Sequence, residues 1–319
     1  MSIIYDMFSI ALMFATPILI AGLGGLFSER SGIVNIALEG MMQVGAFACA
    51  GLVFVLEPSF VPGSYMPIIL GLCLGSVVGL ILSIIHAYAS INLKADQTIS
   101  GTAINLLATG ISLYGCQILF DQQRTPTFRK AISKITVPLL SEIPVIGDLL
   151  FTNVYPTFFL GLLIMVIVWF IVFKTPFGLR LRSCGEFPQA SASMGINVTK
   201  MRYFGVLASG FLAGLAGGVM VMSQDTQFTV ATIHGYGFIA IAALIFGKWN
   251  PFGLLGASIF FGFAQALGLY VKDIPFLAAF PPEFFNSLPY LLTIVALIVF
   301  SGKYSGPKSA GEIYDEGKR

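Results

Sequence analysis

Polar side chains recur at every fourth position in one otherwise apolar stretch, at Asn35, Glu39 and Gln43. On a continuous helix this spacing places all three side chains on one face. Amides and a carboxylate can exchange hydrogen bonds with a polar solute, whereas lipid cannot satisfy them. An ionisable residue in a membrane span normally faces the protein interior or a watery cavity. This face is therefore predicted either to line such a cavity or to tie two helices together.

Two positions elsewhere in the chain extend this polar set. Asn105 lies a turn or more inside another apolar run, where it either contacts a solute or hydrogen-bonds a neighbouring helix. Phe238 lies in residues 235–247, a short apolar segment with glycine at both ends. Short or broken segments in the two halves of a membrane protein point to a binding site near mid-membrane. The candidate residues lining a solute path are Asn35, Glu39, Gln43, Asn105 and Phe238.

The composition places the chain among polytopic membrane proteins. Of its 319 residues, 56% are hydrophobic and 10% are charged, and the mean hydropathy is +0.89. No soluble core needs so large an apolar fraction. The net charge is only +2 and the basic residues form no stripe, which argues against a nucleic-acid partner. The cysteines lack metal-type spacing, and three of the four fall in apolar runs, so they are expected to pack as small hydrophobes.

Nine apolar runs are long enough to cross a membrane, or nearly so. They are residues 5–27, 33–56, 67–91, 99–120, 155–173, 203–222, 236–249, 252–271 and 287–300. A crossing helix needs about 20 residues, so the short run 236–249 is expected to be re-entrant or broken. Glycines at four-residue intervals, as at Gly71, Gly75 and Gly79, predict close helix contacts. The predicted fold is all-α and polytopic, with about nine transmembrane helices and a range of about 8–10.

The distribution of charge gives an orientation. Residues 174–202 carry five basic residues against the single acid Glu186, and positive charge beside membrane spans marks the cytoplasmic side. Counting outwards predicts an outside N-terminus, a cytoplasmic C-terminus and a transmembrane domain at residues 1–302, followed by a polar tail at 303–319. Residues 121–153 also carry basic residues, yet this count places them outside. That exception is expected only where such a loop is tied into a folded external cap.

The basic segment 174–202 also contains the signals of a short helix. Pro188 suits a first helical position, Glu186 lies just before it where the helix dipole favours an anion, and Gly195 can adopt the left-handed conformation that ends a helix. These signals predict an exposed helix of about two turns. Such a helix is either a plain connector between spans or a docking element.

This segment resembles the cytoplasmic motif of the permeases of ABC importers. The resemblance rests on residues 175–180, Gly185, Gln189-Ala190-Ser191 and residues 195–197. In that family the motif reads Glu-Ala-Ala, three variable residues, Gly, and it forms a coupling helix that docks on an ATPase subunit. Here a glutamine replaces the glutamate and a serine replaces the second alanine. The resemblance assigns ATPase coupling to Glu186, Gln189, Ala190, Ser191 and Gly195.

Two further motifs extend the resemblance over residues 16–268. Residues 24–40 and 235–251 look like the permease branch that serves nucleosides, simple sugars and branched-chain amino acids, and they match the nucleoside-type permeases of bacteria best. The resemblance implies a multi-pass permease in the lipid of the bacterial cell membrane. It also implies a second permease chain, identical or paralogous, a cytoplasmic ATPase and an extracytoplasmic substrate-binding protein. The expected cargo is a small polar solute, nucleosides ahead of simple sugars or branched-chain amino acids.

Several kinds of chemistry have no counterpart in the sequence. Gly247-Lys248 and Gly302-Lys303 lack the upstream glycine and the following hydroxyl of a nucleotide-binding loop, so ATP is expected to bind to another chain. No metal-type His/Glu pair and no nucleophile elbow occurs, so we expect a transporter subunit with no cofactor and no metal. The alternative is an ion-coupled secondary transporter using Glu39 and Asp96. Such proteins bury several ionisable groups along the path, whereas only Glu39 lies well inside a predicted span.

Overall fold

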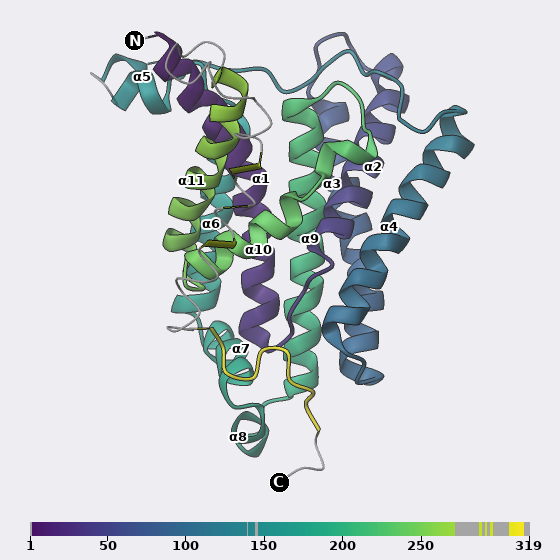
Figure 1. Ribbon diagram of the computed structural model, residues 1–319, viewed down its shortest axis with the longest axis vertical. Coiled ribbons are helices and arrows are strands. Elements are labelled where there is room, and N and C mark those ends of the chain that lie inside the picture. The colour runs from purple at the N-terminus through teal and green to yellow at the C-terminus, as the bar shows by residue number, and fades with distance from the viewer. Residues whose placement is uncertain are drawn as a thin grey trace.

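The computed structural model describes residues 2–271 apart from 139, 144 and 145, and beyond them residues 287, 288, 291, 294, 295 and 306–315. Figure 1 shows an elongated bundle of helices. In chain order these are α1 (Ser2–Ser31), α2 (Leu38–Leu56), α3 (Met66–Ala87), α4 (Gln97–Phe120), α5 (Ile146–Leu150), α6 (Pro156–Lys174), α7 (Pro176–Glu186), α8 (Pro188–Ser193), α9 (Val198–Gln224), α10 (Tyr236–Phe246) and α11 (Pro251–Tyr270).

The predicted all-α membrane class is confirmed. Seven helices among the described residues are long and apolar enough to cross a membrane: α1, α2, α3, α4, α6, α9 and α11. The predicted run 236–249 instead forms α10, whose 11 residues extend about 16 Å, roughly half the hydrocarbon thickness. The predicted run 287–300 lies almost entirely outside the described residues, so the count of nine stays a prediction. Within the described part of the chain, the only strand-like pairing is an isolated bridge between Ile135 and Val154.

The first of two interruptions in the bundle precedes α2. The chain leaves α1 at Ser31 and runs irregularly through residues 32–37, and Gly32 has a φ of +100°. The helix expected over residues 33–56 therefore begins five residues late. Asn35 lies in the irregular segment, so the prediction that it shares one helix face with Glu39 and Gln43 is wrong. Sequence periodicity missed the break because side chains of other helices satisfy its backbone, as described below.

The second interruption precedes α10. Residues 225–235 contain only the short 3-10 helix Val230–Ile233, and Gly235 enters α10 with a φ of +87°. The N-terminus of α10 abuts the N-terminus of α2, because a Cβ on Gly237 would lie 2.5 Å from the Cα of Glu39. In Figure 1, α10 runs obliquely through the middle of the bundle. Two helices thus begin next to each other inside the protein.

Glycines bring the central helices α2, α3 and α9 into backbone contact, as the four-residue glycine spacing predicts. A Cβ on Gly75 would lie 2.7 Å from the carbonyl oxygen of Gly45 and 3.3 Å from that of Gly214. Gly217 packs directly on the carbonyl group of Met42. Such close approach leaves no room for a side chain and fixes the position of α2 against α9.

The two ends of the bundle differ in content (Figure 1). Helices α7 and α8 lie at one end, called here the α7–α8 end, together with residues 306–315. The N-terminus of α1 and the loop of residues 121–155 lie at the opposite end. That loop is fastened to the end of α9 and the segment after it, because the amides of Thr125, Phe128 and Ile132 donate to the carbonyl groups of Phe228, Thr226 and Met222. It therefore forms a tied cap rather than a loose connection.

Candidate functional site

Glu39 joins the two interrupted helices. Its Oε1 accepts a hydrogen bond from the amide of Gly235 and its Oε2 accepts one from the amide of Gly237, each at 2.6 Å. The first amides of a helix have no partner within the helix, and the helix dipole makes that end attractive to an anion. Glu39 lies in the first turn of α2 as well as at the N-terminus of α10. One carboxylate therefore stabilises the beginnings of both helices.

Asn35 and Asn105 hold the interrupted segment before α2. The Nδ2 of Asn35, which is 2% exposed, donates to the Oγ of Ser209 at 2.9 Å, and its Oδ1 accepts from the amide of Ala37 at 3.1 Å. Asn105 accepts from the amide of Gly40 at 2.8 Å and donates to the carbonyl oxygen of Ile36 at 3.0 Å. Both side chains thus make the interhelical ties that the sequence left open as one of two alternatives.

Further side chains complete the hydrogen bonding of this segment. Gln97 accepts from the amide of Val34 at 2.7 Å, His86 contacts the carbonyl oxygen of Val34 at 3.2 Å, and Ser28 donates to the carbonyl oxygen of Ile33 at 2.7 Å. Sequence reasoning assigned none of them to the site. Gln97 is 4% exposed in the structure, and its only signal in the sequence is its position as a polar residue at the beginning of an apolar run.

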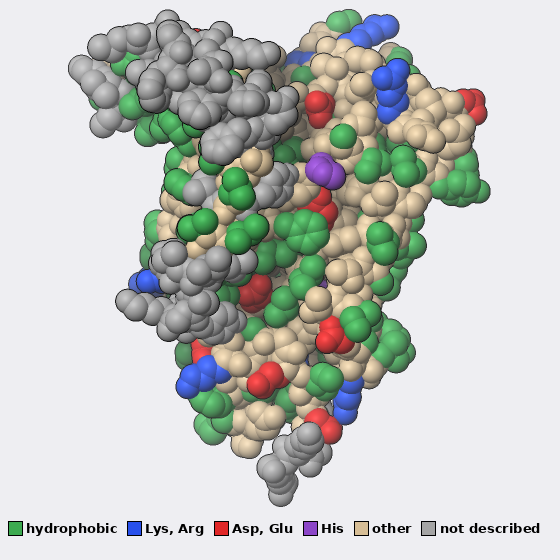
Figure 2. Space-filling view, viewed as in Figure 1, with side chains coloured by type: hydrophobic (Ala, Val, Ile, Leu, Met, Phe, Trp, Pro, Cys, Tyr) green, Lys and Arg blue, Asp and Glu red, His purple; other side chains and the backbone are tan. Residues whose placement is uncertain are grey.

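The remaining candidates lie where α2, α4 and α10 meet. Gln43 is 5% exposed; its Oε1 accepts from the hydroxyl of Thr109 at 3.2 Å, and its buried Nε2 has no hydrogen-bond partner among the described residues. Glu39, Asn105 and Thr109 are partly exposed, and Phe238 is 47% exposed. Figure 2 shows the face that carries α10, where acidic side chains lie among hydrophobic ones and other surface.

The polar character continues along α4 towards the α7–α8 end. Thr102 and Thr98 are exposed and lie about one and two turns before Asn105, on the same side of the helix. A row of hydroxyl and amide groups on a membrane helix is costly against lipid. This row therefore faces water or another protein surface. Asp96, the other acid that the ion-coupled alternative requires, instead caps α4 by accepting from the amides of Thr98 and Ile99.

The short helix predicted in the basic segment is α8. It has six residues, begins with Pro188 as predicted, and is closed by Gly195 at a φ of +81°. The amide of Ile196 donates back to the carbonyl oxygen of Ser191 at 3.1 Å, as expected for a helix ended by a left-handed glycine. The longer helix α7 was not predicted. Its local signal is Thr175, whose hydroxyl accepts from the amide of Gly178 at 3.1 Å, followed by a proline.

The predicted coupling residues do not all reach the surface. Gln189, Ala190 and Gly195 are exposed, whereas Ser191 is 5% exposed and donates to the carbonyl oxygen of Phe187. Glu186 forms an ion pair with Arg30, with 3.8 Å between Oε1 and Nη1.

Beside α8 lies a shallow hollow of about 280 Å³. Phe187 and Met194 line it and are 56% and 82% exposed. Large apolar side chains that protrude at an otherwise polar end are typical of a protein interface.

In the described part of the chain, no group of three or more histidine, cysteine, aspartate and glutamate residues could hold a metal ion. The site therefore consists of hydrogen-bonding groups, a carboxylate, two helix N-termini and an aromatic ring. Such an arrangement can bind and release a polar solute.

The chain is similar to known transport proteins over nearly its whole length. The family described as branched-chain amino acid transport system / permease component matches residues 7–297. The guanosine ABC transporter permease protein NupQ of Bacillus subtilis is 46% identical over 97% of this chain and 96% of its own length. The nucleoside ABC transporter permease protein NupC of Lactococcus lactis is 42% identical over 96% of both. A second guanosine permease protein of Bacillus subtilis, NupP, is 26% identical over 90% of this chain and 78% of its own length.

Proposed function

Because the chain belongs to the branched-chain amino acid transport system / permease component family, we propose that it is the membrane-spanning permease of an ABC importer for nucleosides. Two relatives above 40% identity, matched over nearly their whole length, are named as guanosine or nucleoside permeases. The chain is a multi-pass membrane protein and not an enzyme, and ATP hydrolysis belongs to a separate subunit.

The observation that carries the proposed path is the meeting of two helix N-termini at Glu39, beside a polar face of α2 and α4. A nucleoside offers hydroxyl groups and ring nitrogens that match the partly exposed side chains of Glu39, Asn105 and Thr109. It also offers a flat base, and the exposed ring of Phe238 supplies a surface on which a base can stack. In this proposal Asn35 does not touch the solute, because it is buried and holds the interrupted segment.

A second permease chain would complete this path. Glu39, Asn105 and Phe238 are at least partly exposed, so one chain lines only one side of the solute. Bacillus subtilis has two guanosine permease proteins similar to this chain, one at 46% and the other at 26% identity. That difference favours a paralogous partner over a second copy of the same chain.

The α7–α8 end is the proposed docking surface of the ATPase. Its exposed apolar side chains, Phe187 and Met194, lie beside Ala190, and the same segment of the chain carries Arg180, Arg182 and Lys200. Positive charge at this end agrees with a cytoplasmic location. The N-terminus of α1 then lies outside the cell.

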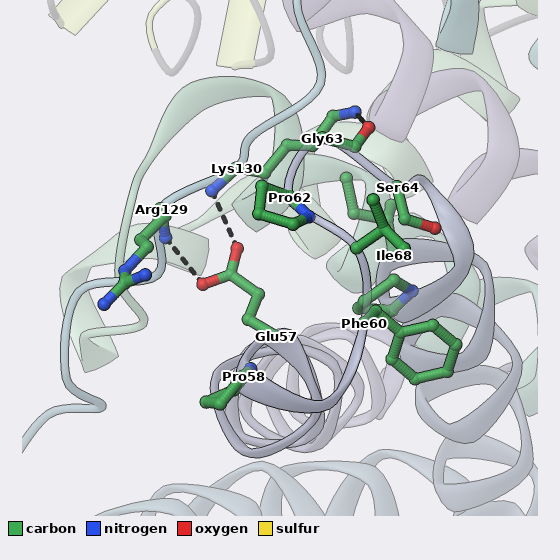
Figure 3. Close-up of a pocket in the computed structure, with 11 residues that line it drawn as sticks. Glu57, Pro58, Phe60, Pro62, Gly63, Ser64, Ile68, Arg129 and Lys130 are labelled. Atoms are coloured by element: carbon green, nitrogen blue, oxygen red, sulfur yellow. Dashed lines mark hydrogen bonds between the residues drawn. The ribbon is translucent and has the colours of Figure 1, made fainter.

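The opposite end is the proposed contact for the substrate-binding protein. Figure 3 shows a cavity of about 390 Å³ there, in which the carboxylate of Glu57 accepts from the amides of Arg129 and Lys130 at 2.8 and 2.7 Å. The backbone thus satisfies Glu57 and leaves Arg129 exposed, while the Nζ of Lys130 donates to the carbonyl oxygen of Gly63 and lies 3.4 Å from the ring centre of Tyr65. An exposed basic side chain on the outside suits an acidic surface of the binding protein.

Competition in whole cells tests the substrate class. Uptake of labelled guanosine should fall when unlabelled adenosine or cytidine is added in excess, and it should persist with glucose, ribose or leucine. If a sugar or leucine competes as strongly as a nucleoside does, the proposed substrate class is wrong. Deleting the gene for this chain, with the other importer genes intact, provides the background rate.

A further inference from the structure

We propose that α10 is the moving part of the solute gate. Glu29 and Arg30, at the end of α1, transmit to α10 the movement of residues 174–202, called here the docking loop. This inference rests on the proposed function. It assigns a role to residues that do not touch the solute path and are not on the docking surface. Arg30 and Glu29 are therefore positioning residues.

The two ends of α10 make different contacts. Its N-terminus is held by Glu39 through the two amide hydrogen bonds described above. Its C-terminus leads into a tight turn in which Lys248 and Trp249 both have a φ of +52°. Because α10 is one short helix, a displacement of this turn moves its N-terminus as well. Positive φ angles mark both ends of α10, at Gly235 and at the turn.

Glu29 and Arg30 bind the turn after α10 from two sides. The indole Nε1 of Trp249 donates to the carboxylate of Glu29, and both side chains are buried, at 2% and 5% exposed. The guanidinium of Arg30 donates to the carbonyl oxygen of Trp249 at 3.0 Å. The side chain and the main chain of Trp249 are thus both bound by neighbouring residues of α1, Glu29 and Arg30. The turn cannot shift without Glu29 and Arg30, or without breaking these bonds.

Arg30 also reaches the proposed docking loop. Its Nη1 lies 3.8 Å from the carboxylate of Glu186, the last residue of α7, and its guanidinium lies 5.8 Å from the ring centre of Phe173. Gly185 packs on the main chain of Arg30, since a Cβ there would lie 2.5 Å from the carbonyl oxygen of Arg30. The guanidinium of Arg30 therefore connects the end of α7 with the turn after α10.

The C-terminal segment of residues 306–315 strengthens this connection. The amide of Ser309 donates to the carbonyl oxygen of Gly185 at 2.9 Å, and the amide of Gly311 donates to that of Gly32 at 3.3 Å. The segment thus clamps the docking loop against the end of α1. In this proposal, a displacement of α8 therefore also displaces Glu29 and Arg30.

A continuous set of contacts is not by itself evidence of energetic coupling, so the test must measure coupling. The complete importer is reconstituted in proteoliposomes with its ATPase, partner permease and binding protein. Four versions of this chain are compared: wild type, Arg30→Gln, Glu186→Gln and Lys94→Gln. Lys94 forms an ion pair with Asp315 at the same end, at 3.1 Å, and serves as the matched control.

We expect Arg30→Gln to keep ATP hydrolysis while guanosine uptake per ATP falls at least tenfold. Glu186→Gln should lower uptake per ATP by a similar factor, and Lys94→Gln should behave like wild type. If Arg30→Gln prevents assembly of the importer, the uptake per ATP of Glu186→Gln decides, because the Glu186 side chain is more exposed than that of Arg30. Wild-type ratios in both variants, or equal losses of hydrolysis and uptake, would overturn the inference. If the proposed function itself fails, wild type shows no ATP-dependent uptake.

Fluorescence of Trp249 gives a second readout. The chain has two tryptophans, so Trp169→Phe leaves Trp249 as its only one. Subtracting the spectrum of a complex that also carries Trp249→Phe isolates its signal. We expect ATP to change this signal in the Trp169→Phe complex and not when Glu186→Gln is added. A response to ATP that survives Glu186→Gln contradicts transmission through Arg30.

Discussion

At the scale of single residues, the polar groups inside the bundle are satisfied by partners far away in the sequence. Sequence spacing identified Glu39 and Asn105 as unusual but could not name their partners. The two amides that donate hydrogen bonds to Glu39 are 196 and 198 positions away along the chain, and no local pattern encodes such a pairing. Spacing by four also suggested a shared face for Asn35, which failed because the helix begins only after it.

Replacing Glu39 with glutamine tests the link between α2 and α10. The amide keeps one acceptor oxygen and turns a donor towards a backbone N–H, so one hydrogen bond to a charged group, worth about 1.5–3 kcal/mol, is lost. We expect ATP-dependent uptake to fall at least about tenfold. Glu57→Gln is the matched control, because Glu57 also accepts two amides but lies far from the path. At saturating binding protein it should transport normally; equal uptake by both variants would remove Glu39 from the gate.

Asn105→Leu should destabilise the interrupted segment. It leaves the amide of Gly40 and the carbonyl oxygen of Ile36 without partners, at about 1–3 kcal/mol each. The melting temperature in detergent should fall clearly. Thr102→Val is the control, because the Thr102 hydroxyl bonds only within its own helix. A melting temperature equal to that of the control would show that these bonds contribute nothing.

At the scale of elements, local signals predicted more than long-range contacts did. Pro188 and Gly195 predicted α8 because capping depends on adjacent residues, and the short apolar run predicted that α10 would not cross fully. The break before α2 was missed because its backbone groups are satisfied by side chains of α1, α3 and α4. An apolar run there looks the same whether its backbone bonds stay local or go to neighbouring helices.

Close packing of α2 on α9 should tolerate no methyl group at Gly217. A Cβ there would overlap the carbonyl group of Met42, whereas a Cβ on Gly256 in α11 meets nothing within 4 Å. We expect Gly217→Ala to lower stability by at least about 2 kcal/mol through overpacking, and Gly256→Ala to be neutral or stabilising by up to about 1 kcal/mol. Thermal unfolding of the two variants side by side measures this. Similar melting temperatures would contradict the observed helix contact.

Helix α8 should tolerate a bulky residue structurally but not functionally. Ala190 is exposed, so Ala190→Trp should leave the melting temperature of the chain unchanged while it reduces copurification of the ATPase. Thr127→Trp, exposed at the opposite end, is the control and should retain the ATPase. If Ala190→Trp retains it equally, α8 is a connector and not a docking element.

At the scale of the whole molecule, the three proposed sites lie along one axis. The end with residues 121–155 presents exposed basic side chains, the middle holds two interrupted helices around Glu39, and the α7–α8 end presents exposed apolar side chains. Composition and hydropathy were sufficient to predict a membrane bundle. They could not predict that the middle is held by one carboxylate, because that depends on how distant segments meet.

Reconstitution of uptake tests the central claim most directly. Proteoliposomes containing this chain, its partner permease and the ATPase, with binding protein and guanosine outside and ATP inside, should accumulate guanosine. Accumulation should stop with a non-hydrolysable ATP analogue or when the ATPase is omitted. Guanosine accumulation by this chain alone under a proton or sodium gradient, without ATP, would contradict the account.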